Sequence, residues 1–294
     1  RLRCDWSSDV CSSDLTTRRT GGGPVAETSP GTSEKEPQVI TEYETMMYKR
    51  LGKTAYIMFN RPQALNAVND QFEEDLHSAL LEFDLDDEAW VAIIHGAGRS
   101  FCAGADIKQR FVAMTPEQSA RRERGPNPEG YMGRAINWKP VIAAVHGYAL
   151  GAGIVIAAES DMIVASEDAK FGITETRRGL PGGRIWAKVN AFMPSKIASE
   201  MVITGEHIDA AELYRLGLIN RLVPTGEHVS AAEELAEKVL KSPPLATRAA
   251  VKLTRRQWVQ TGADADMQML PLKLHLTEDF KEASQSFVEK RAPE

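Results

Sequence analysis

Two short apolar runs, each ended by glycines, restrict the fold of this chain more than any other feature. They are WVAIIHGAG at residues 90–98 and KPVIAAVHGYAL at residues 139–150. Both are rich in valine, isoleucine and alanine and are short for helices, so each predicts a buried strand. The runs SFCAGADIKQR and GAGIVIAAESD follow them and predict helices. Strands that alternate with helices predict an α/β fold.

Further strands and helices are predicted around these runs. Two β-rich runs that flank residues 51–53 predict a hairpin. Asn69 can cap a helix that extends to about residue 83, because four apolar residues recur on one helical face: Phe72, Leu76, Leu80 and Phe83. The runs MIVASED and AKFGI predict short strands, and the pattern after Pro181 becomes largely helical.

The first 41 residues differ in character from the rest. Residues 1–15 include DWSSDVCSSD, which matches one reading frame of a common sequencing-library adaptor, so we interpret them as an assembly artefact. Residues 16–41 are rich in Thr, Gly, Pro, Ser and Glu, a composition that predicts disorder. We expect the core at residues 42–200 and a helical C-terminal region at residues 201–294.

Composition and charge narrow the possible partners. The net charge of −6 over 294 residues does not favour a nucleic-acid surface. No apolar run approaches the roughly 20 residues that span a bilayer, so no membrane partner is expected. Beyond residues 1–15 the remaining cysteine is Cys102, which predicts no disulfides and a reducing compartment, the cytoplasm. The histidines lack metal-ligand spacing, so no metal site is predicted.

Two glycine-containing turns carry backbone N–H groups that can take part in binding or catalysis. One contains Ala105 within FCAGADIK, and the other contains Ala152 within GYALGAG, just before an apolar helix. Amide N–H groups at such turns and helix starts favour negative charge, so these two can bind an oxyanion. The alternative is that the small residues serve only for close packing. The glycine spacing does not match G-x-G-x-x-G, and no G-x-S-x-G motif occurs.

Glu175 follows a short apolar strand in the run FGITETRRGLP. A carboxylate that is partly buried there has its pKa raised by desolvation, which suits proton transfer near neutral pH. The alternative is an ion pair with Arg177 or Arg178 on a solvated turn.

Together, and in this order, these motifs resemble those of the crotonase superfamily, also called the enoyl-CoA hydratase/isomerase family. The resemblance extends from about residue 42 to the C-terminus and includes RPQALNAVN, SFCAGADIK, KPVIAAVHGYALGAG, AKFGITETRRGL and ITGEHIDAAELYRLGLINRLVP. It implies a spiral of ββα units, a C-terminal helical region that builds a homotrimer or a dimer of trimers, and an acyl-CoA substrate without a separate cofactor.

The resemblance also implies roles for individual residues. Ala105 and Ala152 supply the N–H groups that hold the thioester oxyanion, and Glu175 transfers the proton. Arg184 and Trp186 are candidates for the acyl pocket, with a surface arginine and a core tryptophan as the alternative. Coenzyme A is expected to bind at a further set of residues: Gln63, Ala64, Leu65, Ala103, Asp106 and Ile107.

One departure from the family pattern bears on the reaction. Typical hydratases carry a first glutamate in the helix after the glycine-rich turn, where this chain has Val155, a further candidate for the acyl pocket. Glu159 lies one helical turn later and is expected to point elsewhere. Because two carboxylates hold and split water in hydration, a single one favours double-bond isomerisation.

Other functions remain open from the sequence. Relatives with similar sites catalyse lyase and hydrolase reactions, and a non-catalytic scaffold that binds acyl-CoA or RNA is a further alternative, motivated by Val155. Residues 111–138 are polar and arginine-rich and are predicted to form a substrate lid. Lys290 or Arg291 can reach coenzyme A phosphates or form a solvated charged face.

Overall fold

The computed structural model describes residues 39–109, 131, 138–269 and 276–292. The predicted artefact at residues 1–15 and most of the predicted lid lie outside these residues. The predicted disordered segment also lies outside them, except for residues 39–41. Those three residues were predicted to be disordered but belong to strand β1 (Val39–Glu42). Two contacts hold them in place: Val39 packs against the core, and Thr41 Oγ1 donates to Glu82 Oε1 at 2.7 Å.

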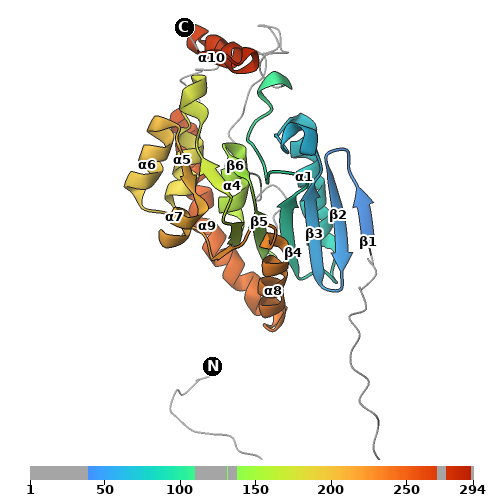
Figure 1. The fold of residues 1–294 in the computed structure, drawn as a ribbon. Helices are drawn as coiled ribbons and strands as arrows, with labels where there is room; N and C mark the ends of the chain where they lie inside the picture. Colours follow the sequence, from blue (N-terminus) through green and yellow to red (C-terminus); the bar gives the residue numbers. More distant parts are fainter. Residues whose placement is uncertain (1–38, 110–130, 132–137, 270–275, 293–294) are drawn as a thin grey trace, which may run out of the picture. The chain divides into compact units, whose positions relative to one another are not determined.

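A seven-stranded sheet in the order β1-β2-β3-β4-β5-β7-β10 forms the centre (Figure 1). Strands β1, β2 and β3 pair antiparallel, whereas β3, β4, β5, β7 and β10 pair parallel. The strands after β1 are β2 (Met46–Leu51), β3 (Thr54–Phe59), β4 (Val91–Gly96), β5 (Val141–Val145), β7 (Met162–Ser166) and β10 (Arg221–Val223). The predicted hairpin and α/β class are confirmed.

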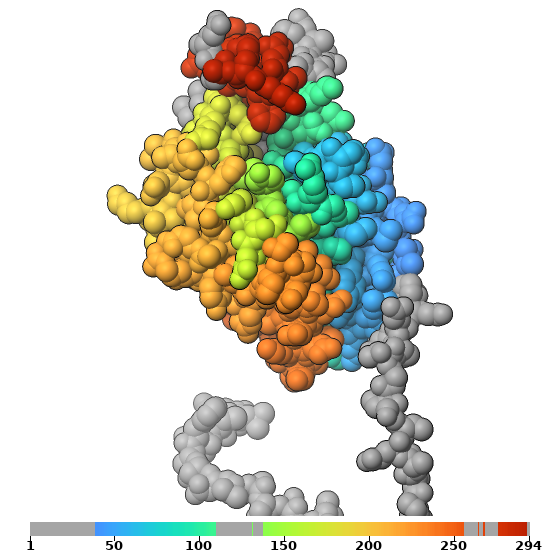
Figure 2. All heavy atoms as spheres, in the orientation of Figure 1, coloured from blue at the N-terminus to red at the C-terminus, as the bar shows by residue number. Residues whose placement is uncertain are grey.

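Side chains alternate between the two faces of this sheet, and each face has its own helices. One face packs against α1 (Asp70–Leu85) and α4 (Ala152–Glu159) in the larger apolar cluster. The other face packs against α8 (His228–Leu240), whose Ala232, Leu235 and Ala236 meet Ile93 and Ile142 of the strands. Figure 2 shows α8 in orange on the viewed side of the molecule. Asn69 caps α1 as predicted, since its side chain accepts from the amide of Phe72 at 2.9 Å.

The predicted strand at residues 139–150 is wrong as a single strand. It divides into β5 and β6 (Tyr148–Leu150), and β6 joins a second sheet in the order β6-β8-β9. The break lies at Gly147, whose φ of 56° is the left-handed conformation that glycine tolerates. A side chain there would also collide with Arg99, because an added Cβ lies 2.0 Å from its carbonyl oxygen.

The chain after Pro181 is largely helical but also returns to both sheets. Strand β9 (His207–Asp209) pairs with β8 (Lys170–Gly172), and β10 pairs with β7. The predicted helical region did not include these two strands. The remaining elements are η1 (Pro62–Ala64), η3 (Glu175–Arg178), α5 (Gly183–Asn190), α6 (Ser195–Thr204), α7 (Ala210–Arg215), α9 (Pro244–Met269) and α10 (Glu278–Glu289).

Candidate active site

The two glycine-containing turns predicted to carry the oxyanion amides lie side by side. The amide of Cys102 donates to the carbonyl of Tyr148 at 2.9 Å, and the amide of Leu150 donates back to the carbonyl of Cys102 at 3.0 Å. Gly104 is so close to the second turn that an added Cβ would lie 2.9 Å from Leu150 O. That Cβ would also lie 3.8 Å from Gly151 Cα. Ala105 and Ala152 follow these two adjoining glycines, so the fold brings them together.

The amides of Ala105 and Ala152 are available to an anion. Neither donates a hydrogen bond to another residue in the part of the chain that the structure describes. Ala152 is the first residue of α4, where the helix leaves its N–H groups without partners within the helix. The partial positive charge of the helix start adds to the attraction for a negative oxygen.

Glu175 lies against the same turn. It begins η3, and an added Cβ on Gly151 would come within 2.5 Å of its Oε1. Its Oε2 is buried and has no hydrogen-bond partner among the described residues. Burial raises the pKa of Glu175 to about 7, against the opposing effects of its own amide, Arg178 and the Thr174 amide. A carboxyl group that titrates near neutral pH can both accept and return a proton.

The structure does not support the alternative in which Glu175 forms an ion pair with Arg177 or Arg178. Arg177 forms its ion pair with Glu206, and its Nε donates to the carbonyl of Thr204 at 3.0 Å. Arg178 donates from Nη1 to the carbonyl and hydroxyl oxygens of Thr174. Within the described residues, no ion pair joins Glu175 to either arginine. Its carboxyl group is therefore not neutralised by an ion pair with either arginine.

Val155 occupies the first turn of α4 and is buried. Glu159, one turn further along α4, is also buried, where it forms an ion pair with Lys188 of α5. Its Oε2 also accepts from the amide of Tyr131 at 2.7 Å. Glu159 is therefore engaged by these two partners, and no hydrogen bond or ion pair joins it to Glu175 among the described residues.

The segments predicted to hold coenzyme A adjoin one another. The amide of Ala103 donates to the carbonyl of Leu65 at 3.0 Å, and the amide of Asp106 donates to the carbonyl of Val68 at 2.8 Å. Gln63 and Ala64 form most of η1, and Ile107 begins the next helical turn. The fold thus brings all six predicted residues into two adjacent stretches of chain.

Two polar side chains organise this region, a structural role that the sequence did not indicate. Asn66 is fully buried, with a φ of 55°, and its side chain donates to the carbonyls of Ala97 and Ser100 at 2.9 and 2.8 Å. Arg61 is also buried and forms an ion pair with Asp106 at 3.0 Å. The signal for these contacts was weak, because they join residues 31 to 45 positions apart.

Arg184 and Trp186 occupy the first turns of α5. The preceding Gly182 approaches Glu175, since an added Cβ would lie 3.5 Å from the Glu175 Cβ. Trp186 packs against the core, and its Nε1 donates to Ser199 Oγ on α6 at 3.3 Å. The contact to α6 fits the alternative of a core tryptophan.

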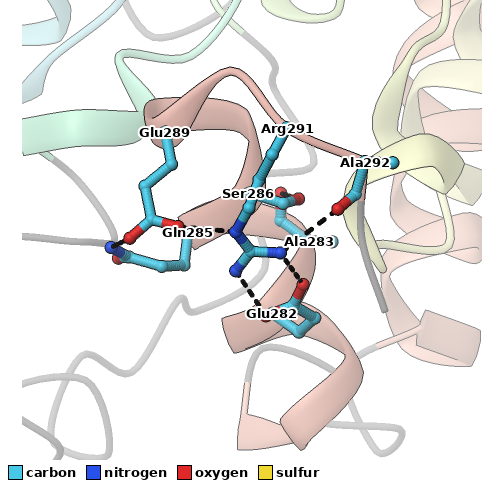
Figure 3. A network of polar contacts seen from close by, with 7 residues as sticks. All are labelled: Glu282, Ala283, Gln285, Ser286, Glu289, Arg291 and Ala292. Atoms are coloured by element: carbon cyan, nitrogen blue, oxygen red, sulfur yellow. Dashed lines mark hydrogen bonds and ion pairs between the residues drawn. The ribbon is translucent and has the colours of Figure 1, made fainter.

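The basic residues after α10 are engaged within their own segment. Arg291 bonds Glu282 and Glu289 across the end of the helix (Figure 3). Lys290 has a φ of 56° and ends α10. Because Arg291 is held in these ion pairs, the structure fits the alternative of a charged surface better than that of a site for coenzyme A phosphates. Among the described residues, no group of histidine, cysteine, aspartate or glutamate side chains is suited to a metal ion. No described helix combines the length and apolarity that a membrane span requires.

An α/β fold in which two free amides adjoin a buried carboxyl group defines a class of protein: one that can stabilise a negative oxygen while moving a proton. Comparison with known proteins gives the family. The model of the enoyl-CoA hydratase/isomerase family matches residues 50–294. The chain belongs to this family, whose enzymes act on acyl-CoA thioesters.

Named relatives cover most of the chain. It is 34% identical over 251 residues to (E)-benzylidenesuccinyl-CoA hydratase from Thauera aromatica, covering 81% of this chain and 94% of that protein. It is 33% identical over 259 residues to short-chain-enoyl-CoA hydratase from Clostridium acetobutylicum, covering 85% and 97%. The crystal structure of carnitinyl-CoA hydratase from Mycobacterium avium matches with a TM-score of 0.68 and 34% identity, covering 86% and 98%. The predicted crotonase-like fold is confirmed.

Proposed function

We propose that this protein transfers protons on an enoyl-CoA thioester with Glu175 as its one acid/base carboxylate, and that it isomerises double bonds. The observation that carries the proposal is the buried Glu175 carboxyl group beside Gly151, with a pKa raised to about 7. At neutral pH a substantial fraction of this group is ionised and ready to accept a proton.

The proposed reaction needs one base and one oxyanion site. Glu175 removes a proton from the carbon next to the thioester carbonyl, and the electron pair moves onto the carbonyl oxygen. The amides of Ala105 and Ala152 stabilise that oxygen, and such donors contribute roughly 3 kcal/mol each in other enzymes. Glu175 then returns the proton at the γ-carbon, the double bond shifts, and the carboxylate is regenerated.

Val155 supports isomerisation over hydration. Hydration needs a water molecule held and split at the site, and the valine side chain offers no hydrogen bond for it. Hydration remains the second candidate because the named relatives are hydratases. If it occurs, Glu175 must hold and deprotonate the water without help from a carboxylate at position 155.

Assembly into a homotrimer or a dimer of trimers is part of the proposal. It is supported by apolar side chains that are strongly exposed on helices of the single chain, namely Ile203, Leu245 and Leu253. Large exposed apolar patches mark subunit interfaces, so these side chains are the candidates for such an interface here.

One experiment separates the candidates. The purified protein is incubated in heavy water with a panel of 2-enoyl- and 3-enoyl-CoA esters of different chain lengths, and the products are analysed by mass spectrometry. Isomerisation shifts the double bond without adding water, so its product is identified by chromatography against 2-enoyl- and 3-enoyl-CoA standards, whereas hydration adds one water molecule. Hydration without isomerisation would contradict the preferred reaction. Binding with neither a double-bond shift, nor added water, nor deuterium uptake would instead indicate a scaffold.

A further inference from the structure

The turn that carries Glu175 is covered by the C-terminal helix α10. The backbone of Phe280 lies against Gly179, where an added Cβ would be 2.9 Å from Phe280 Cα. One face of α10 carries both Phe280 and Phe287, because residues seven apart lie on the same side of a helix. Figure 2 shows α10 in red against the yellow-green atoms of the chain that follows Glu175.

Arg178 lies on η3, three residues after Glu175, and contacts α10. The guanidinium group stacks on the ring of Phe287, with Cζ 4.5 Å from the ring centroid. Nη1 donates to the Thr174 carbonyl at 3.0 Å and to its hydroxyl at 2.5 Å, so the side chain folds back over η3. Nε is buried and has no partner among the described residues. An arginine that is stacked and hydrogen-bonded in this way keeps its charge in one place.

We infer that Arg178 is a positioning residue for Glu175, and that α10 holds it there through Phe287. This inference rests on the proposed role of Glu175. The helix is itself built to stay folded: Thr277 caps its start, and Arg291 joins Glu282 and Glu289 at its end (Figure 3). The C-terminal helix thereby sets how strong a base the site contains.

The other charged groups near Glu175 have different partners. On η3, Arg177 pairs with Glu206, and on α5, Lys188 pairs with Glu159 of α4. Arg184 also lies on α5, and Asp279 lies on α10. Arg178 is the charged side chain that lowers the pKa of Glu175 against the effect of burial. Burial lowers the pKa of Arg178 itself, and the nearby Glu175 carboxylate opposes that shift. The two groups thus stabilise each other's charged forms without a direct ion pair.

The test is the pH dependence of Glu175 in Arg178→Gln, with Arg177→Gln as the matched control. Loss of a nearby positive charge raises a carboxyl pKa by roughly one unit. The ascending limb of kcat/KM should therefore move up by about one pH unit in Arg178→Gln. In that variant kcat/KM should fall about tenfold at pH 6 and stay near normal at pH 9. Arg178→Lys should largely restore the wild-type limb, and Arg177→Gln should leave it unchanged. A uniform loss of activity at every pH would overturn the inference.

Two further measurements keep the test decisive. Phe287→Leu removes the aromatic ring but leaves the charge of Arg178. It should therefore move the ascending limb of kcat/KM to higher pH, by less than Arg178→Gln does. No shift in a folded Phe287→Leu protein would rule out the role of α10. Infrared titration of the Glu175 carboxyl band, identified by its loss in Glu175→Gln, reads the pKa without activity. If the kinetic limb persists in Glu175→Gln, the proposed function fails. If the ascending limb is lost in Glu175→Gln but does not move in Arg178→Gln, only the inference about Arg178 fails.

Discussion

At Glu175, burial and a neighbouring cation act in opposite directions on one carboxyl group. Burial raises its pKa to about 7, and Arg178 and two backbone amides limit the rise. Gly151 makes the arrangement possible, because its φ of 53° and the 2.5 Å from an added Cβ to Glu175 Oε1 leave no room for a side chain. The proposed chemistry thus depends on one acid and on the backbone around it.

The buried side chain at position 155 is expected to determine whether water adds to the substrate. Val155→Glu restores the carboxylate that hydratases of the family carry at this position, so water can be held between two acids. We expect the ratio of hydrated to isomerised product to rise at least about tenfold, measured by product mass. Val155→Gln is the control, since it has similar size without an ionisable group. Equal product ratios in the two variants would contradict this explanation.

The sequence predicted the site residues better than their surroundings. Ala105, Ala152 and Glu175 lie in motifs that can be read locally, and the family resemblance gave their roles. The packing of Arg178 against Phe287 could not be predicted, because it joins residues 109 positions apart. The structural role of the buried Asn66 could not be predicted for the same reason, since the carbonyls to which it donates belong to a distant loop.

At the scale of elements, helices α4 and α5 are joined by a buried ion pair. The side chains of Lys188 and Glu159 are 5% and 0% exposed. Removing one partner of such a pair leaves an uncompensated charge in the core, which is far more costly than losing a surface pair.

Lys188→Met should therefore lower the free energy of unfolding by about 3 to 5 kcal/mol, measured by urea denaturation. The double variant Glu159→Leu/Lys188→Met should recover much of this loss. Lys170→Met is the matched control, because its ion pair with Asp209 is exposed and contributes about 0 to 1 kcal/mol. A Lys188→Met protein as stable as Lys170→Met would show that the pair is not needed.

Elements with local signals were predicted and elements held by distant partners were not. Helix α1 has its cap and apolar face within its own sequence. Strands β9 and β10 have three residues each and exist because β8 and β7 supply their hydrogen-bond partners. The break between β5 and β6 depends on the left-handed conformation of Gly147, which the apolar run around it conceals.

At the scale of the whole molecule, three histidines meet where α8 begins to cover the sheet. The rings of His146 and His228 stack at 4.4 Å, and both have a buried Nδ1 without a partner among the described residues. Desolvation, and then the other two histidines, lower the pKa of His95 to about 4. Desolvation, and then His146, lower that of His228 to about 4.

His95 and His228 should make the fold sensitive to acid. The unfolded chain takes up their protons near pH 6.5, whereas the folded chain does so near pH 4. Stability is therefore retained above pH 6.5 and lost as the pH falls towards 4. We expect a loss of roughly 1 to 3 kcal/mol per buried histidine, measured by denaturation at each pH. His95→Gln should flatten this dependence; a slope equal to that of the wild type would refute the assignment.

The central claim is that Glu175 moves the proton beside two backbone amides. It is tested most directly by deuterium exchange at the α-carbon of a bound acyl-CoA in heavy water, comparing the wild type with Glu175→Gln at equal thioester occupancy. We expect Glu175→Gln to bind the thioester normally and to exchange at least about a hundredfold more slowly. Exchange at the wild-type rate in that variant would rule out Glu175 as the group that moves the proton.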